Sequence, residues 1–300
     1  MSHGHDHGAS NFNRAFAIGI GLNLAFVAVE ATYGMIANSL ALVADAGHNL
    51  SDVLGLVLAW IASRLVRRPL TARRSYGWRR SSVLAALANA VFLLIAIGAI
   101  AYEAIRRFGD PAPVAGKTVI VVALIGIGIN TLTALLFAAG RKGDLNIRGA
   151  FLHMAADAGV SAGVVIAGLI MLATDWDWLD PVVSLLIAGV IFLGTWGLLR
   201  DSFNMALDAV PDDIDPAMVT RGLLTVPGVT GVHDLHIWNM STTEVALTAH
   251  LVVPLEKNND ALLHWASQEL HDRYEIQHVT LQIERGDPEY PCASAEPGVL

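Results

Sequence analysis

The 300-residue sequence is 54% hydrophobic and only 15% charged, and its mean hydropathy is +0.52. Soluble domains contain about 25% charged residues, so this composition excludes an ordinary soluble enzyme and indicates a membrane protein. The formal net charge of −8 is divided unevenly, because residues 1–200 carry +4 and residues 201–300 carry −12. A membrane domain followed by an acidic soluble domain is therefore predicted. The acidic part excludes nucleic acid as a partner, since phosphates would repel it.

The chain begins with a polar segment, residues 1–11, that we predict to be a disordered tail. It contains three histidines and an aspartate, at His3, His5, His7 and Asp6. A short histidine tract of this kind predicts weak metal binding at most. The segment also lacks the layout of a cleaved signal peptide.

Six apolar runs follow, and each is long enough to cross a bilayer as a helix, which takes about 20 residues. They are residues 12–36, 40–62, 83–105, 118–139, 150–173 and 181–199. Asp180 and Pro181 have the residue types of an N-cap and a first helical position, and so predict the start of the sixth helix. The sequence thus predicts an all-α transmembrane domain of six helices over residues 12–200.

The connections between these runs predict their orientation. Basic residues fill the connections between the second and third runs and between the fourth and fifth runs, at Arg64, Arg67, Arg68, Arg73, Arg74, Arg79, Arg80, Arg141, Lys142 and Arg148. The loops on the opposite side are mainly acidic, with Asp110, Asp175, Asp177 and Asp180. The positive-inside rule then places both termini in the cytoplasm.

After about residue 201 the pattern becomes that of a small α+β domain that ends near residue 286. Its predicted order is helix 215–224, strand 229–238, strand 245–253, helix 260–274 and strand 278–284. In the last strand Val279, Leu281 and Ile283 alternate with polar residues, which is the period of a half-buried strand. Residues 287–300, which include the single cysteine, Cys292, show no periodicity and are predicted to be a disordered tail.

Ionisable residues inside two of the apolar runs carry the functional signal. His48 and Asp52 lie in the second run, and His153 and Asp157 lie in the fifth. Residues four apart share one face of a helix, and an aspartate inside a span costs about 2.5–3.5 kcal/mol on insertion scales, which favours a functional role. Two imidazoles and two carboxylates form a four-ligand set suited to zinc, with cobalt and cadmium as alternatives. The competing interpretation, local ion pairs or helix kinks facing a polar cavity, explains the repeated spacing less well.

These motifs resemble those of the cation diffusion facilitator family of zinc, cadmium and cobalt efflux transporters. The resemblance covers residues 12–285. Its motifs are Ser39-Leu-Ala-Leu-Val-Ala-Asp-Ala-Gly-His48-Asn-Leu-Ser-Asp52, Leu152-His153-Met-Ala-Ala-Asp157, Asp180-Pro181, Pro227-Gly-Val and His233-Asp-Leu-His-Ile-Trp238. It implies a homodimeric metal/proton antiporter in a bacterial inner membrane, with six spans and a cytoplasmic domain of the ferredoxin or metallochaperone type. It implies Zn²⁺ as the exported substrate, with Cd²⁺ or Co²⁺ as alternatives, no permanently bound cofactor and no enzymatic activity.

The resemblance also implies a cytoplasmic regulatory metal site. His233 and His250 fall where family members place ligands of that site. The third strand, where further ligands are usual, offers Gln282 and Glu284, so Glu284 is the remaining candidate. Surface or core histidines of a soluble domain are an equally good interpretation of these residues.

Three further expectations concern the membrane domain and its border. Asp45 lies two helical turns before Asp52 on nearly the same face, so it is a candidate for the ion path, or else a carboxylate wetted by a cavity. The resemblance implies an ion pair between Arg80 and Asp208. It also places an additional metal site in the loop between the second and third spans, but here that loop is rich in arginine, and we expect no metal there.

The proposed ligands are chemically suited to exchange of metal for protons. Coordination needs neutral histidine and ionised aspartate, and an imidazole with its unperturbed pKa of about 6.5 takes up protons near neutral pH. Two other functions stay open. An intramembrane metalloenzyme would need an open coordination position for water, and a non-transporting metal sensor would need an output partner.

Overall fold

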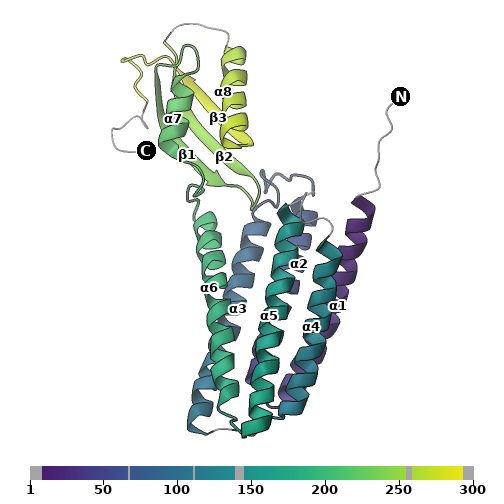
Figure 1. The fold of residues 1–300 in the computed structure, drawn as a ribbon. Coiled ribbons are helices and arrows are strands. Elements are labelled where there is room, and N and C mark those ends of the chain that lie inside the picture. Colours follow the sequence, from purple (N-terminus) through teal and green to yellow (C-terminus); the bar gives the residue numbers. More distant parts are fainter. Residues whose placement is uncertain (1–8, 67, 111, 139–144, 255–258, 293–300) are drawn as a thin grey trace, which may run out of the picture. The chain divides into compact units, whose positions relative to one another are not determined.

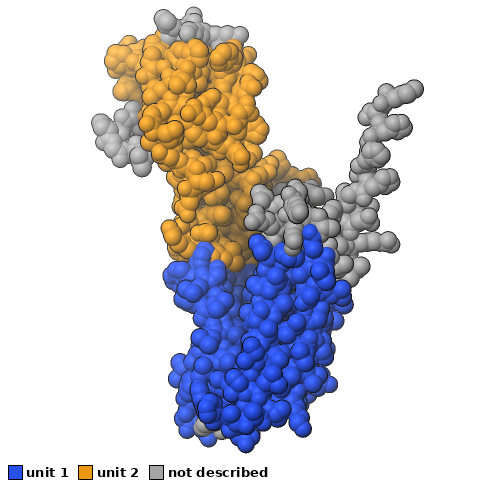
Figure 2. Space-filling view, in the orientation of Figure 1, with its two compact units in different colours: residues 1–57, 88–197 blue, residues 58–87, 198–300 orange. Residues whose placement is uncertain are grey.

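The computed structural model contains a bundle of long helices and a small α+β domain (Figure 1). It describes residues 9–66, 68–110, 112–138, 145–254 and 259–292. The chain divides into two compact units, Met1–Val57 with Ala88–Gly197 and Leu58–Leu87 with Leu198–Leu300 (Figure 2). The first unit contains most of the helical bundle, and the second contains the α+β domain.

Up to residue 206 the described chain forms six long helices, as the six apolar runs predict. They are α1 (Ala9–Ile36), α2 (Leu40–Val66), α3 (Ser81–Gly109), α4 (Gly116–Ala138), α5 (Leu145–Thr174) and α6 (Leu179–Ala206). By length and composition, α2 to α6 each contain a stretch able to cross a membrane, and the part of α1 whose side chains the structure describes, Gly21–Ile36, is apolar as well. A helical membrane domain followed by a small α+β domain confirms the predicted fold class.

The first unit, called the helical unit below, has large apolar side chains on its surface. Met35, Ile95 and Leu193 are 70%, 68% and 76% exposed. An apolar exterior of this kind indicates a surface covered by lipid rather than water.

Small residues let neighbouring helices of this unit approach closely. A Cβ atom added at Gly168 of α5 would lie 2.8 Å from Ile120 Cγ1 of α4, and one added at Gly126 of α4 would lie 2.7 Å from Phe26 Cζ of α1. Membrane helices associate mainly through such close packing. The glycine positions therefore fix how α4, α5 and α1 lie against one another.

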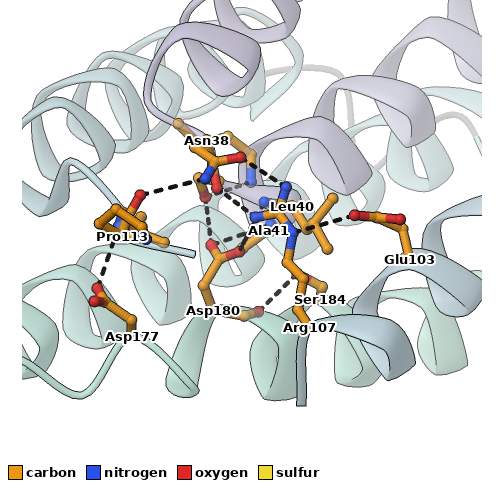
Figure 3. A network of polar contacts seen from close by, with 12 residues as sticks. Asn38, Leu40, Ala41, Glu103, Arg107, Pro113, Asp177, Asp180 and Ser184 are labelled. Carbon is orange, nitrogen blue, oxygen red and sulfur yellow. Dashed lines mark hydrogen bonds and ion pairs between the residues drawn. The ribbon is translucent and has the colours of Figure 1, made fainter. Parts of the chain in front are cut away.

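Asp180 was expected to cap its own helix, and in this respect the prediction is wrong. Helix α6 begins at Leu179, one residue earlier, and the Asp180 carboxylate lies instead at the N-terminus of α2 (Figure 3). It accepts hydrogen bonds from Ser39 Oγ at 2.5 Å, from the Leu40 N–H at 2.7 Å and from the Ala41 N–H at 3.4 Å. A helix leaves its first N–H groups without intrahelical partners, so the acid of α6 serves as the cap of α2.

Arg107 of α3 completes this network (Figure 3). Its guanidinium donates to the backbone oxygen and to Oδ1 of Asn38, at 2.5 and 2.8 Å, and lies 3.9 Å from Asp180 Oδ2. Asn38, between α1 and α2, has a φ of 56°, a left-handed conformation that asparagine tolerates better than most residues. Charge and hydrogen bonds thus tie the start of α2 to α3 and α6.

The α+β domain follows the predicted order of elements closely. Its elements are α7 (Pro216–Leu224), β1 (Gly231–Asn239), β2 (Val245–Val252), α8 (Asn259–Tyr274) and β3 (His278–Glu284). The sheet has the order β1-β2-β3, with β1 antiparallel and β3 parallel to β2. The alternating Val279, Leu281 and Ile283 pack against the core of the domain, as their period predicts.

The second unit also contains the predicted ion pair between Arg80 and Asp208, which is confirmed. Both side chains are about half exposed, so the pair orients the chain more than it stabilises it. Next to it, Arg79 Nη1 lies 2.8 Å from Glu244 Oε2. These contacts join the arginine-rich segment before α3 to the α+β domain within one unit.

Candidate metal centre

The two His-x-x-x-Asp pairs meet within the helical unit. His48 and Asp52 extend from α2, and His153 and Asp157 extend from α5. His153 Nε2 lies 3.0 Å from Asp52 Oδ2 and 3.6 Å from Asp157 Oδ2. His48 Nε2 lies 3.5 Å from Asp157 Oδ1 and 3.7 Å from Asp52 Oδ2. Each imidazole therefore faces one carboxylate on its own helix and one on the other helix.

These separations are those of a small coordination sphere. Bonds of about 2.0–2.2 Å to nitrogen and oxygen around a tetrahedral zinc ion place the ligand atoms about 3.3–3.6 Å apart. The four contacts, from 3.0 to 3.7 Å, lie around this range. Ligand atoms of Asp52, His153 and Asp157 lie within 4.8 Å of one another, close enough to hold one metal ion, whereas His48 is not part of that group. His48 faces Asp157 Oδ1 and His153 faces Asp157 Oδ2, so a small rearrangement is needed before all four residues share one ion.

The side chains of the site differ in how far they are buried. The Asp157 side chain is 2% exposed, whereas those of Asp52 and His153 are 32% and 40% exposed. Asp157 Oδ2 accepts no hydrogen bond within the described residues. A buried carboxylate oxygen without a donor is costly unless a cation or proton meets it, so the site has the character of a cation acceptor.

Two further acids lie buried close to this site, Asp45 on α2 and Glu30 on α1. Asp45 is 1% exposed and accepts a hydrogen bond from Ser161 Oγ of α5 at 3.1 Å. Glu30 of α1 is fully buried and accepts one from Asn49 Nδ2 of α2 at 3.1 Å. Asp45 Oδ1 and Glu30 Oε1 have no donor among the described residues. The burial of Asp45 argues against a carboxylate wetted at a helix end.

A second cluster of metal-binding side chains lies on the three-stranded sheet. His233 of β1 pairs with His250 of β2, and Glu284 ends β3. His233 Nε2 lies 3.2 Å from Glu284 Oε2, and His250 Nδ1 lies 2.8 Å from Glu284 Oε1. The three residues that the sequence singled out are therefore brought together.

Sequence reasoning missed Cys292, which joins this cluster. Its Sγ lies 3.3 Å from His250 Nδ1, and ligand atoms of His233, His250, Glu284 and Cys292 lie within 4.8 Å of one another. Burial works to raise the pKa of the Glu284 carboxyl, but hydrogen bonds from Cys292 and Gln282 and the nearby imidazoles outweigh burial and hold that pKa below its ordinary value. The only sequence signal was the residue type, since nothing in the tail shows that it returns to the sheet.

Several predictions lie outside the described residues. These are the N-terminal histidines His3, His5 and His7 with Asp6, the basic residues Arg67, Arg141 and Lys142, and the last eight residues of the tail. The side chain of Arg148 also lies outside the part of the chain that the structure describes. For all of them the expectations from the sequence stay predictions.

Comparison with known proteins identifies the class of protein. Residues 16–205 match the family model of the cation efflux transmembrane domain, and residues 211–286 match that of the cation efflux protein cytoplasmic domain. Both matches describe a membrane transporter and not an enzyme. The chain belongs to the cation diffusion facilitator family of metal cation efflux proteins.

The relatives cover almost the whole chain. The metal cation efflux system protein CzcD of Cupriavidus metallidurans is 36% identical over 98% of this chain and 92% of its own length. The zinc transporter ZitB of Escherichia coli is 37% identical over 95% of this chain and 93% of its own length. The cadmium, cobalt and zinc/H(+)-K(+) antiporter of Bacillus subtilis is 33% identical over 95% of this chain and 92% of its own length. A solved metal-bound C-terminal domain of the CzcD transporter is 39% identical and covers 24% of this chain and 99% of that domain, with a TM-score of 0.23.

Proposed function

We propose that this chain exports divalent transition metal ions, zinc first, from the cytoplasm in exchange for protons. The transport site would consist of His48, Asp52, His153 and Asp157 in a membrane domain of residues 12–200. The convergence of the two repeated pairs, with all four contacts between 3.0 and 3.7 Å, is the observation that carries this proposal. The relatives named as zinc and cadmium transporters support the choice of substrate.

Charge balance gives the site a reason to exchange its cations. Two ionised carboxylates and two neutral imidazoles compensate the charge of one divalent ion, so the loaded site is neutral overall. Without the metal, two negative charges stay in a region where the Asp157 side chain is 2% exposed, and burying unpaired charge is costly. Protons on the imidazoles restore neutrality, so metal and protons replace one another at the same atoms. Alternating access of this site to the two sides of the membrane then turns exchange into antiport.

A four-ligand site favours transport over the two alternatives. A catalytic zinc keeps an open position for water, whereas the proposed site would use both pairs as a complete set of four ligands. A sensor must bind the ion without moving it, and sequence similarity over almost the full length of efflux proteins does not favour that role.

The proposal also covers the membrane, the oligomeric state and the orientation of the protein. We place the protein in a bacterial inner membrane as a homodimer, with both termini and the domain of residues 201–286 in the cytoplasm. The arginine-rich connections support this orientation. His233, His250 and Glu284 would form a second, regulatory metal site in that domain, apart from the transport path.

Zinc flux into sealed proteoliposomes that contain the purified full chain tests the transport site. Asp157→Asn keeps the shape of the side chain and removes the charge that the metal needs, so we expect zinc flux to fall at least about tenfold. The matched control is Asp110→Asn, because Asp110 lies exposed after α3 and its change should leave flux unaltered. Circular dichroism and gel filtration verify that both variants fold. Flux near the wild-type level in Asp157→Asn would remove this residue from the site, and zinc binding without any flux in the wild type would favour a sensor.

A further inference from the structure

The chain after β3 turns back toward the sheet. Gly286 has a φ of 68°, a conformation that glycine adopts without strain. Beyond it, the Tyr290 N–H donates to the Asp287 backbone oxygen at 3.1 Å, and the Glu289 N–H donates to Asp287 Oδ1 at 2.9 Å. This turn returns the chain so that Cys292, eight residues after Glu284, lies beside His250. The segment is therefore folded over the cluster.

Each histidine of the cluster turns one ring nitrogen atom toward the other side chains of the cluster. His250 Nδ1 faces Glu284 and Cys292, while its other nitrogen, Nε2, lies 3.4 Å from Asp234 Oδ2. Histidine ligands commonly donate their second N–H to a carboxylate, which fixes the ring and the tautomer. His233 Nε2 is buried 3.2 Å from Glu284 Oε2 and makes no hydrogen bond among the described residues. Both rings are thus oriented as ligands are.

A β-bulge supplies the orienting carboxylate. The pairing of β1 with β2 shifts between His233 and His236, and Asp234 in the bulge has a φ of 50°. Asp234 therefore contacts both His250 and, through Oδ1 at 3.1 Å, His236 Nε2. Bulges that re-aim a side chain are common beside functional sites. Here the bulge makes Asp234 a positioning residue for His250.

We infer that Cys292 is the fourth ligand of the cytoplasmic metal site, so that a bound metal fastens the C-terminal tail to the ends of three strands. Bonds of about 2.0–2.3 Å to nitrogen, oxygen and sulfur give ligand separations of about 3.3–3.8 Å around a tetrahedral ion. The contacts of 2.8, 3.2 and 3.3 Å among these side chains need only small adjustments to reach this range. The inference deepens the proposed regulatory site and is independent of transport.

The thiolate of Cys292 determines the metal selectivity expected of this site. Two imidazoles, one carboxylate and one thiolate suit Zn²⁺ and Cd²⁺, whereas Mg²⁺ prefers oxygen ligands and keeps its water. The transport site, by contrast, contains no sulfur. A bond between metal and sulfur therefore reports on the cytoplasmic site alone.

Alkylation of the thiol tests this inference directly, because Cys292 is the single cysteine of the chain. A maleimide label added to the purified full chain in detergent reacts with this residue only, and the thiolate is both the nucleophile and the metal ligand. We expect Zn²⁺ and Cd²⁺ to slow labelling at least about tenfold, and Mg²⁺ to leave the rate unchanged. Cd²⁺ should also produce an ultraviolet sulfur-to-cadmium charge-transfer band that is lost in Cys292→Ser.

Three variants separate the outcomes. His250→Ala should lose the protection, whereas His264→Ala, an exposed histidine of α8, should retain it. Asp157→Ala should retain it as well, because it removes only the proposed transport site. Labelling that Cd²⁺ does not slow, or protection that persists in His250→Ala, would overturn the inference. Failure of the transport proposal would instead appear as normal flux in the Asp157 variants with protection intact.

Discussion

His48 and His153 occupy matched positions, and each contacts both carboxylates of the candidate transport site. Their nitrogen atoms distinguish this set from one made of oxygen alone. Imidazole suits zinc well, while carboxylates bind a wider range of divalent ions. Metal selectivity should therefore depend on the histidines more than on the aspartates.

His48→Asp tests this dependence. The change replaces a nitrogen ligand by a third carboxylate, which should relax the preference for zinc and let larger ions such as cadmium compete better. We expect the ratio of zinc to cadmium flux in proteoliposomes to fall by at least about threefold. His264→Asp, on the exposed face of α8, is the control for added charge. An unchanged ratio in His48→Asp would place selectivity elsewhere.

The individual residues of the two candidate sites differ in how well the sequence predicts them. His48 and Asp157 were accessible to sequence reasoning because the helical period places residues four apart on one face. Cys292 could not be predicted in this way. Its position depends on a turn at residues 286–290, and a turn leaves no periodic pattern in the sequence. Local spacing predicts candidate ligands on one element, whereas a candidate ligand on an irregular segment is found only from the tertiary structure.

At the scale of elements, the cap of α2 by Asp180 positions half of the candidate transport site. Ser39 holds the N-cap position of α2 and accepts from the Leu42 N–H, while Asp180 accepts from Ser39 Oγ and from the Leu40 and Ala41 N–H groups and so connects α2 with α6. A hydrogen bond to a charged group contributes about 1.5–3 kcal/mol. Asp180→Ala should therefore lower the thermal stability of the purified chain and speed hydrogen exchange at Leu40 and Ala41. Asp175→Asn, at an exposed position just before α6, is the control and should change neither quantity. Slow exchange at Leu40 in Asp180→Ala would show that the cap does not hold the start of α2.

The same residue shows where prediction of elements reaches its limit. Composition and length predicted all six helices, and strand β3 (His278–Glu284) has the predicted bounds. Asp180 followed by Pro181 has the residue types of a cap for its own helix, yet its carboxylate serves α2. The residue type was informative, but which helix receives the cap is decided by how the helices pack.

At the scale of the whole molecule, exchange requires that the metal and the protons compete for one site. The candidate metal sites on the two units complicate the measurement, because zinc bound at the cluster of His233, His250, Glu284 and Cys292 would also displace protons. His250→Ala removes a ligand of that cluster while leaving the helical unit unchanged. Proton release in this background reports on the transport site.

In the His250→Ala background, zinc binding should release protons from His48 and His153. Coordination requires neutral imidazole, so zinc affinity must rise as the pH rises through the titration of these groups, between about pH 6 and 7.5 for unperturbed histidine. Calorimetry in buffers of different ionisation enthalpy measures the protons released for each zinc bound. The number should decrease when His153→Gln is added and stay the same when His271→Gln is added, since His271 lies exposed on α8. If zinc affinity did not change across this pH range and no protons were released, the exchange would have to operate through other groups, and the buried Glu30 and Asp45 would be the next to test.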